Sequence, residues 1–122
     1  MAGVYDLTYK GKLIVCVDVT DLEIQRKSEF QSILAKAGEK IRKNSPKSQL
    51  IITNVKGTRF DKEMAECMKD YAKGNNPYVK ASAVVGLEGL QKIIFTAIRT
   101  FTGRDFHIAE SMEEAQEWLA AQ

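Results

Sequence analysis

One stretch, residues 79–103, constrains the fold of this chain more than any other. It reads VKASAVVGLEGLQKIIFTAIRTFTG. Its first seven residues are small or β-branched and nearly uncharged, which is typical of a central strand that is covered on both faces. Glycines at 86 and 89 then predict a turn. Apolar residues at spacings of three and four predict a helix after that turn, and Gly103 stands where a helix ends.

The same spacing predicts how this helix is oriented. The apolar residues that share one predicted face are Leu90, Ile93, Ile94, Ala97, Ile98 and Phe101. With this face against the sheet, Phe95 points outward, beside Lys92 and Arg99. Because aromatic and Arg side chains are enriched at contact surfaces, we expect an interface at Phe95 and Arg99, with Ile98 at its edge. The alternative is that Phe95 lies under the stems of its neighbours or beneath the C-terminal helix.

The rest of the chain alternates between strand and helix patterns. Strands are predicted over 4–9, 13–19, 50–55, 79–85 and 105–109. A helix is predicted to start at a capping box formed by Thr20 and Glu23 and to stop at 44–46, with an apolar face of Phe30, Ile33, Leu34, Ala37 and Ile41. A second helix has apolar positions from 60 to 71, and a last one follows a capping box of Ser111 and Glu114.

This order, β-β-α-β-α-β-α-β-α, predicts the fold class. We expect an α/β protein with a mixed, mostly parallel, five-stranded sheet and four helices, because alternating strands and helices form parallel sheets with right-handed crossovers. The first strand is expected to pair antiparallel at or near one edge. The sequence shows no internal repeat or linker, so residues 1–122 are expected to form a single domain.

Composition and charge exclude several classes of protein. The chain is 44% hydrophobic and 28% charged, which argues against disorder, and its formal net charge is only +2, which argues against a nucleic-acid partner. It has no apolar run of the roughly 20 residues that span a bilayer and no signal-peptide pattern at its start, so a cytoplasmic location is expected. Two cysteines, Cys16 and Cys67, are expected to be buried and reduced.

Candidate chemistry lies where predicted strands end, because ligands gather at the carboxyl ends of parallel strands. The turn at 56–59 offers two cations, a glycine and a hydroxyl before a helix, an arrangement that favours an anion. Its alternative role is a capped turn with Thr58 as N-cap. The predicted ligand- or partner-binding residues are Asn54, Lys56, Gly57, Thr58, Arg59, Gly86 and Gly89.

Catalytic and metal chemistry find less support in the sequence. The single imidazole, His107, is predicted in the last strand, away from any Ser or Thr that it could activate, so no catalytic residue is assigned. Asp18, Asp21 and Glu110 are the alternative acidic cluster for a metal ion. Because Asp21 is expected to serve in capping, neither a metal nor a cofactor is predicted.

Four segments together resemble STAS domains, the family of sporulation anti-sigma-factor antagonists, and the small bacterial STAS-like or CRAL-TRIO-like proteins. They are KGKLIVCVDVT at 10–20, TNVKGTRFD at 53–61, NPYVKASAVVGLEGLQKIIFTAIRTFTGR at 76–104 and SMEEAQEWL at 111–119. The resemblance implies a mixed sheet and no catalysis. Antagonists of this family carry a phosphorylated serine after an Asp at the start of the second helix. Here Asp61 is followed by Lys62 and Glu63, so that phospho-acceptor is missing.

The sequence therefore predicts a non-enzymatic regulatory or protein-interaction module of STAS type. Its partner would be another protein or a second copy of itself, and the loops at 53–59 and 86–89 would form the contact region. The alternative is a sensor that binds a small molecule or an anion, such as a phosphate, a nucleotide or a lipid, through the same loops.

Overall fold

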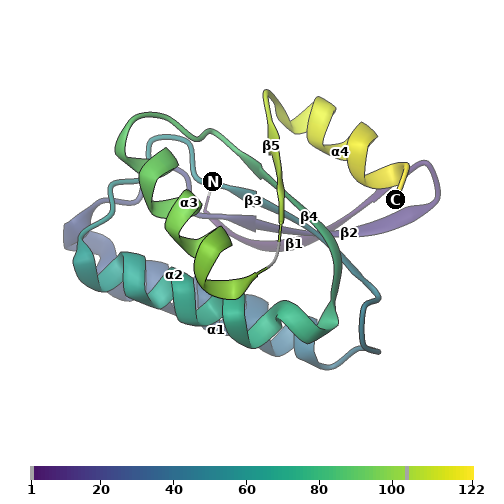
Figure 1. Ribbon diagram of the computed structural model, residues 1–122, viewed down its shortest axis with the longest axis horizontal. Coiled ribbons are helices and arrows are strands. Elements are labelled where there is room, and N and C mark those ends of the chain that lie inside the picture. Colours follow the sequence, from purple (N-terminus) through teal and green to yellow (C-terminus); the bar gives the residue numbers. More distant parts are fainter. Residues whose placement is uncertain (1, 104) are drawn as a thin grey trace.

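The computed structural model describes residues 2–103 and 105–122, which form one five-stranded sheet with helices on both of its faces (Figure 1). The strands are β1 (Gly3–Tyr9), β2 (Lys12–Asp18), β3 (Gln49–Asn54), β4 (Val79–Val85) and β5 (His107–Ala109). The α-helices are α1 (Lys27–Arg42), α2 (Lys62–Asn75), α3 (Leu90–Thr102) and α4 (Met112–Ala120), and short 3-10 helices cover Ile24–Arg26 and Asn76–Tyr78.

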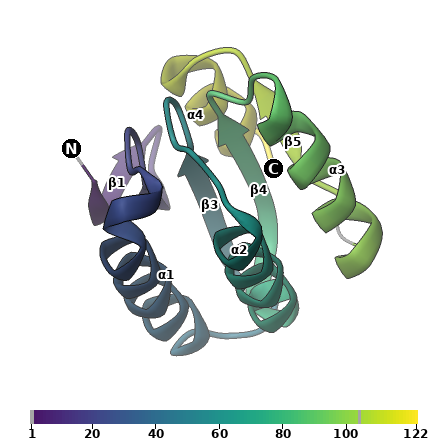
Figure 2. The same ribbon diagram turned by 90° about the vertical axis from the view of Figure 1, so that its left-hand side faces the viewer.

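The order of strands in the sheet follows their order in the chain, β1-β2-β3-β4-β5. β1 pairs antiparallel with β2 at one edge, and every other neighbouring pair is parallel. The expected fold class, with its mixed sheet, its four helices and its antiparallel edge strand, is confirmed. Because α1, α2 and α3 each connect parallel strands, the loops that precede them all lie at the carboxyl end of the sheet (Figure 2).

The two faces of the sheet hold separate hydrophobic clusters. Val15 and Val17 of β2 join the larger cluster with α1, α2 and α3, whereas Ile14 and Cys16 join the smaller cluster with α4. This alternation follows from the two-residue period of a strand. The unequal cover, three helices against one, is visible in Figure 1. None of the helices in residues 2–103 and 105–122 is long and apolar enough to cross a membrane.

Helix α1 has the predicted apolar face but begins later than predicted. Its residues Phe30, Ile33, Leu34, Ala37 and Ile41 are all buried. The predicted capping box is wrong, because the Thr20 hydroxyl donates to Asp18 Oδ1 at 2.6 Å and the helix starts only at Lys27. Asp18 also accepts from the Thr20 backbone N–H, so the carboxylate at the end of β2 holds a turn there instead.

Helix α2 is capped by Asp61, not by Thr58. Asp61 Oδ1 accepts the backbone N–H of Met64 at 2.8 Å, and its other oxygen contacts Lys27 Nζ at 2.5 Å. The ammonium of Lys27, together with the hydrogen bond from Met64, lowers the pKa of the Asp61 carboxyl below its ordinary value. A single carboxylate therefore starts α2 and ties it to α1.

The predicted orientation of α3 is wrong. Phe95 is only 4% exposed and Ile98 5% exposed, so these residues face the sheet. Leu90, Ile93 and Phe101, which were predicted to be core, are 63%, 67% and 46% exposed. Phe95 packs edge-to-face against Phe60 and Phe106, with ring centroids 6.1 and 5.9 Å apart. The expected interface at Phe95 and Ile98 lies in the core instead.

The remaining member of that expected interface, Arg99, is half-buried. Its Nη2 donates to the Phe106 carbonyl at 2.9 Å, and its Nε contacts Asp105 Oδ1 at 2.8 Å. The guanidinium also lies over the Phe106 ring, 4.5 Å from the centroid. Arg99 thus ties the end of α3 to the segment that leads into β5.

The C-terminal segment follows the sequence prediction more closely. Gly103 ends α3 in the left-handed conformation, and the Ser111 side chain accepts from the Glu114 N–H at the start of α4, as the capping box predicts. β5 is shorter than predicted, since it covers only three residues. His107 stacks on Trp118 with ring centroids 4.6 Å apart, and its Nε2 lies 2.8 Å from both Glu114 oxygens.

Candidate functional site

Helix α3 presents an apolar surface that is largely exposed. We call it the α3 face and define it as Leu90, Ile93, Ala97 and Phe101. These positions are spaced three, four and four residues apart, so they form one stripe along the helix. Contiguous exposed apolar patches are uncommon on monomeric soluble proteins and mark interaction sites. The α3 face is therefore the first candidate for function.

Charges are distributed unevenly along the α3 face. The exposed Glu88 precedes it at the helix N-terminus. At the other end, the ammonium groups of Lys69 and Lys73 on α2 lie 4.6 and 4.8 Å from the centroid of the Phe101 ring. One carboxylate, that of Glu88, thus stands at the start of the stripe, and two ammonium groups stand at its end.

A groove continues the α3 face toward the carboxyl ends of the strands. It lies between the loop at 57–60 and the first turns of α3, and it is lined by Ile24, Gly57, Thr58, Arg59, Phe60, Glu88, Leu90, Gln91 and Ile94. Ile24 is 47% exposed and adds apolar area at the far wall. The groove mixes exposed apolar side chains with one exposed cation, Arg59, and one exposed acid, Glu88. Such a surface suits a polypeptide better than a small ion.

Three of the seven predicted binding residues, Gly57, Thr58 and Arg59, line this groove. Asn54 and Lys56 lie beside it, where Asn54 Oδ1 accepts the backbone N–H of Lys56 at 3.1 Å. Gly86 and Gly89 belong to the connection from β4 to α3. The structure therefore gathers the predicted loops at one end of the sheet, and the 57–59 segment lines the groove together with Glu88 of the 86–89 loop.

Buried polar contacts hold the loop at 56–59 in place. The Thr58 hydroxyl donates to the Val19 carbonyl at 2.6 Å, and Thr58 is only 4% exposed. The Gln91 side chain donates to the carbonyls of Val55 and Thr58 at 2.9 and 2.6 Å and accepts from the Glu88 N–H. Gln91 is thus the residue that locks α3 to the loop, and no pattern in the sequence singles it out.

Three of the four backbone amides of this turn already have partners. The N–H of Lys56 is bound by Asn54, that of Thr58 by the Val55 carbonyl and that of Arg59 by the Leu22 carbonyl. Helix α2 begins three residues after Arg59, behind its own carboxylate cap. The turn therefore lacks the converging N–H groups and the open helix terminus of an anion site.

Two glycines allow the loops to approach each other closely. Gly86 has a φ of +90°, and a Cβ at this position would lie 2.6 Å from the Lys56 backbone nitrogen. Gly57 has a φ of +73°, and a Cβ there would collide with the Asp21 carboxylate. These glycines serve the packing of the loops, which accounts for their positions without a ligand.

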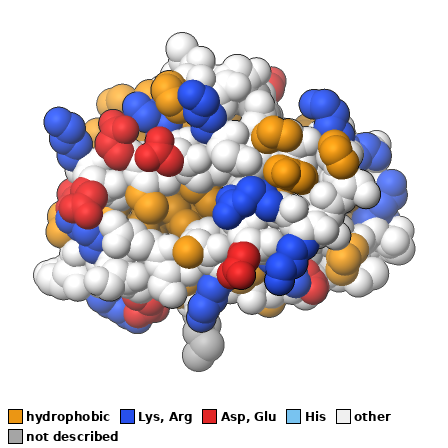
Figure 3. All heavy atoms as spheres, turned by 90° about the horizontal axis from the view of Figure 1, so that it is seen from below, with side chains coloured by type: hydrophobic (Ala, Val, Ile, Leu, Met, Phe, Trp, Pro, Cys, Tyr) orange, Lys and Arg blue, Asp and Glu red, His pale blue; other side chains and the backbone are white. Residues whose placement is uncertain are grey.

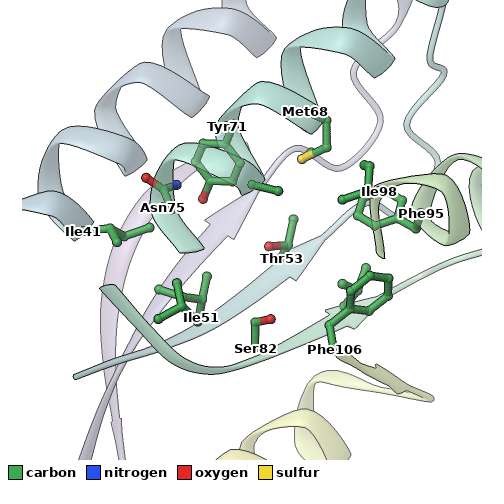
Figure 4. Close-up of a pocket in the computed structure, with 13 residues that line it drawn as sticks. Ile41, Ile51, Thr53, Met68, Tyr71, Asn75, Ser82, Phe95, Ile98 and Phe106 are labelled. Atoms are coloured by element: carbon green, nitrogen blue, oxygen red, sulfur yellow. The ribbon is translucent and has the colours of Figure 1, made fainter. Parts of the chain in front are cut away.

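A small cavity lies between α2, α3 and the sheet (Figure 4). Its volume is about 30 Å³, and its walls are mostly apolar, including Ile51, Ile98 and Phe106. Three polar residues also line it, Thr53, Asn75 and Ser82, and the Asn75 Nδ2 atom has no hydrogen-bond partner among the described residues. A space of this size holds one or two water molecules, so a metabolite would require α3 to move.

A second hollow lies between α1 and α2, on the face seen in Figure 3. Hydrophobic side chains gather at its centre, and both acidic and basic side chains surround it. Its lining includes Leu34, Ala35, Cys67 and Tyr71 together with Arg42 and Glu66. Cys67 and Tyr71 are half-buried, whereas the four residues of the α3 face are all exposed. The hollow therefore offers a partner less exposed apolar surface than the α3 face does.

The thiol and imidazole side chains of the described residues are buried, half-buried or held by neighbouring residues. Burial raises the pKa of the Cys16 thiol to about 11, and burial also raises the pKa of the Cys67 thiol. His107 is engaged by Glu114 and Trp118 on the α4 side of the sheet. Within residues 2–103 and 105–122, no three His, Cys, Asp or Glu side chains gather as a metal site would require.

Comparison with known proteins bears on the fold. No family model matches the sequence, and no curated protein matches it. A solved structure does match, that of an uncharacterized protein of the DUF3478 family with a SpoIIAA-like fold from Shewanella loihica. The TM-score is 0.67 and the sequence identity 16%, over 98% of this chain and 95% of that one. This chain has a SpoIIAA-like fold.

The SpoIIAA-like fold is the one that the resemblance to STAS domains implied, so the match confirms that expectation at the level of architecture. It covers nearly the whole of both chains. At this level of identity the likeness concerns the fold alone, and function has to be argued from the surfaces of this chain.

Proposed function

We propose that this protein is a non-enzymatic regulatory module that acts by binding another protein through the α3 face and the adjoining groove. The observation that carries the proposal is the exposure of Leu90 and Ile93, at 63% and 67%, on the same stripe of a helix whose other apolar side is fully packed. As members of one contiguous stripe, these side chains have apolar area that a partner would bury.

The state of the polar groups supports a binding role over a catalytic one. The Thr58 hydroxyl is buried against the Val19 carbonyl, the Cys16 thiol is buried, and His107 is held by Glu114. None of the three has a base and an open space beside it, as an activated nucleophile needs. We also propose that no phosphorylation switch operates at the start of α2, since the only hydroxyl there, that of Thr58, is inaccessible.

The proposal is tested by a matched pair of substitutions. Ile93→Asp places a charge on the α3 face, whereas Leu13→Asp places the same charge on a residue that is 60% exposed in β2. Proteins captured from the native host by the wild type should be retained by Leu13→Asp and lost by Ile93→Asp. Both variants should melt close to the wild type. Equal retention by the two variants would show that the α3 face is not the contact surface.

A further inference from the structure

The geometry points to a second copy of this chain as the occupant of the α3 face, with the two α3 helices packed antiparallel in a symmetric dimer. This inference rests on the proposed function, because it names the partner of the same surface. It follows from two independent properties of that surface, the sizes of its four side chains and the charges at its two ends.

The side chains of the α3 face complement one another when the helix runs in reverse. An antiparallel pairing sets Leu90 against Phe101 of the second copy and Ile93 against Ala97 of the second copy. The small Ala97 leaves room for the larger Ile93, so the two stripes interdigitate, as packed helices require. All four residues are exposed, and none has to move away from the sheet to make these contacts.

The charges favour the same orientation. In such a dimer the twofold axis is perpendicular to both α3 helices. The α2 helices of the two copies then lie on the same side of the α3 pair, and the start of each α3 lies beside the end of the other. Glu88, at the start of the stripe, then lies beside Lys69 and Lys73 of the second copy, which flank Phe101 there. A parallel pairing would instead leave Glu88 of both copies at the opposite end of the helix pair from the lysines.

Three further cations near the stripe are compatible with this arrangement. Arg59, in the adjoining groove, has its Nε 4.0 Å from Glu23 Oε1, and Lys92 lies one position before Ile93, so it points away from the stripe. Arg99 is turned toward Asp105 and the Phe106 ring, away from the α3 face. On an anionic lipid surface Lys69 and Lys73 would be favoured but Glu88 would face negative charge, whereas in the antiparallel dimer Glu88 and the two lysines are all matched by opposite charges. The observations therefore favour a second copy over a membrane.

The first test measures mass against concentration. Light scattering from about 10 μM to about 1 mM should show the mass rising from the 13.7 kDa of one chain toward twice that value, as expected for a small symmetric interface. Ile93→Asp should weaken association at least about tenfold, and Leu13→Asp should leave it unchanged. A wild type that remains monomeric over the whole range overturns the inference.

The second test addresses the antiparallel orientation by reversing charges. Glu88→Lys alone, and Lys69→Glu with Lys73→Glu, should each weaken the dimer several-fold, since each places like charges opposite one another. The chain that carries all three substitutions should recover the wild-type dissociation constant within about threefold. Failure to recover, in variants whose circular-dichroism melts match the wild type, overturns the antiparallel dimer.

The outcomes separate this inference from the proposed function. A monomeric wild type whose host partner is lost by Ile93→Asp refutes the dimer and keeps the protein-binding role. Co-sedimentation with phosphatidylserine vesicles that Ile93→Asp abolishes refutes the dimer in favour of a membrane. A dimer that Ile93→Asp leaves intact refutes the α3 face as its interface.

Discussion

Helices α1 and α3 are both amphipathic, yet only α1 packs as its sequence suggests. In α1 the apolar residues form one band, and that band is buried as predicted. In α3 the apolar residues form two bands: one with Phe95 and Ile98 faces the sheet, and the other is the α3 face. The comparison shows that helical periodicity identifies apolar bands but does not choose between two of them.

Contacts from distant parts of the chain make that choice. Phe30, Phe60, Phe95 and Phe106 form a row of edge-to-face contacts that runs from α1 to the segment before β5. Gln91, on the buried side of α3, satisfies two carbonyls of the loop after β3. Rotating α3 to bury Leu90 and Ile93 would break the aromatic row and leave those carbonyls without Gln91, so the observed orientation is favoured.

The largest expected effect comes from comparing the two phenylalanines of α3. Phe95→Ala should lower the free energy of unfolding by about 3–5 kcal/mol, because it opens a space in the core beside Phe60 and Phe106. Phe101→Ala should lower it by less than about 1 kcal/mol, because Phe101 is 46% exposed and its ring lies beside two lysine ammonium groups at the surface. Urea unfolding at low protein concentration measures both, and similar losses for the two variants would contradict the orientation of α3.

A smaller effect is expected when α3 loses the side-chain hydrogen bonds that Gln91 donates to the loop after β3. Gln91→Leu should cost about 1–3 kcal/mol, since the Val55 and Thr58 carbonyls lose a buried donor. Gln25→Leu, at an exposed position before α1, serves as the control and should change stability little. Chemical denaturation provides the comparison, and a fully neutral Gln91→Leu would mean that the aromatic row alone orients α3.

The smallest expected effect concerns Asp61, whose carboxylate caps α2 and ties it to α1. Helix α3 has no such carboxylate, since its N-cap is Gly89. The pKa of Asp61 is lowered in the folded state, so its contribution to stability is present above the ordinary value of 3.8 and is lost as the pH falls through the folded-state value. The stability difference between the wild type and Asp61→Asn should therefore shrink from about pH 6 to about pH 2.5. A difference that stays constant over this range would show that the carboxylate charge plays no part.

The candidate site was only partly predictable from the sequence. Glycine, hydroxyl and charge at 57–59 marked a loop that does line the groove. The α3 face was assigned to the core, because four apolar residues at regular helical spacing are the usual sign of a packed face. The sequence also contains a second apolar band on this helix, with Phe95 and Ile98. The presence of two bands was the available signal that one band had to be exposed.

Local chemistry determined the elements of this protein. Strand alternation, the Ser111 capping box and the left-handed Gly103 all involve neighbours in sequence, and all occur as the residues predict. The rotation of α3 and the ion pair that ties α2 to α1 depend instead on groups more than 30 positions away, such as Phe60 for Phe95 and Lys27 for Asp61. Only tertiary packing selects such partners. Burial and ion pairing act between residues that are close in space, so they produce no regular spacing in the sequence from which they could be predicted.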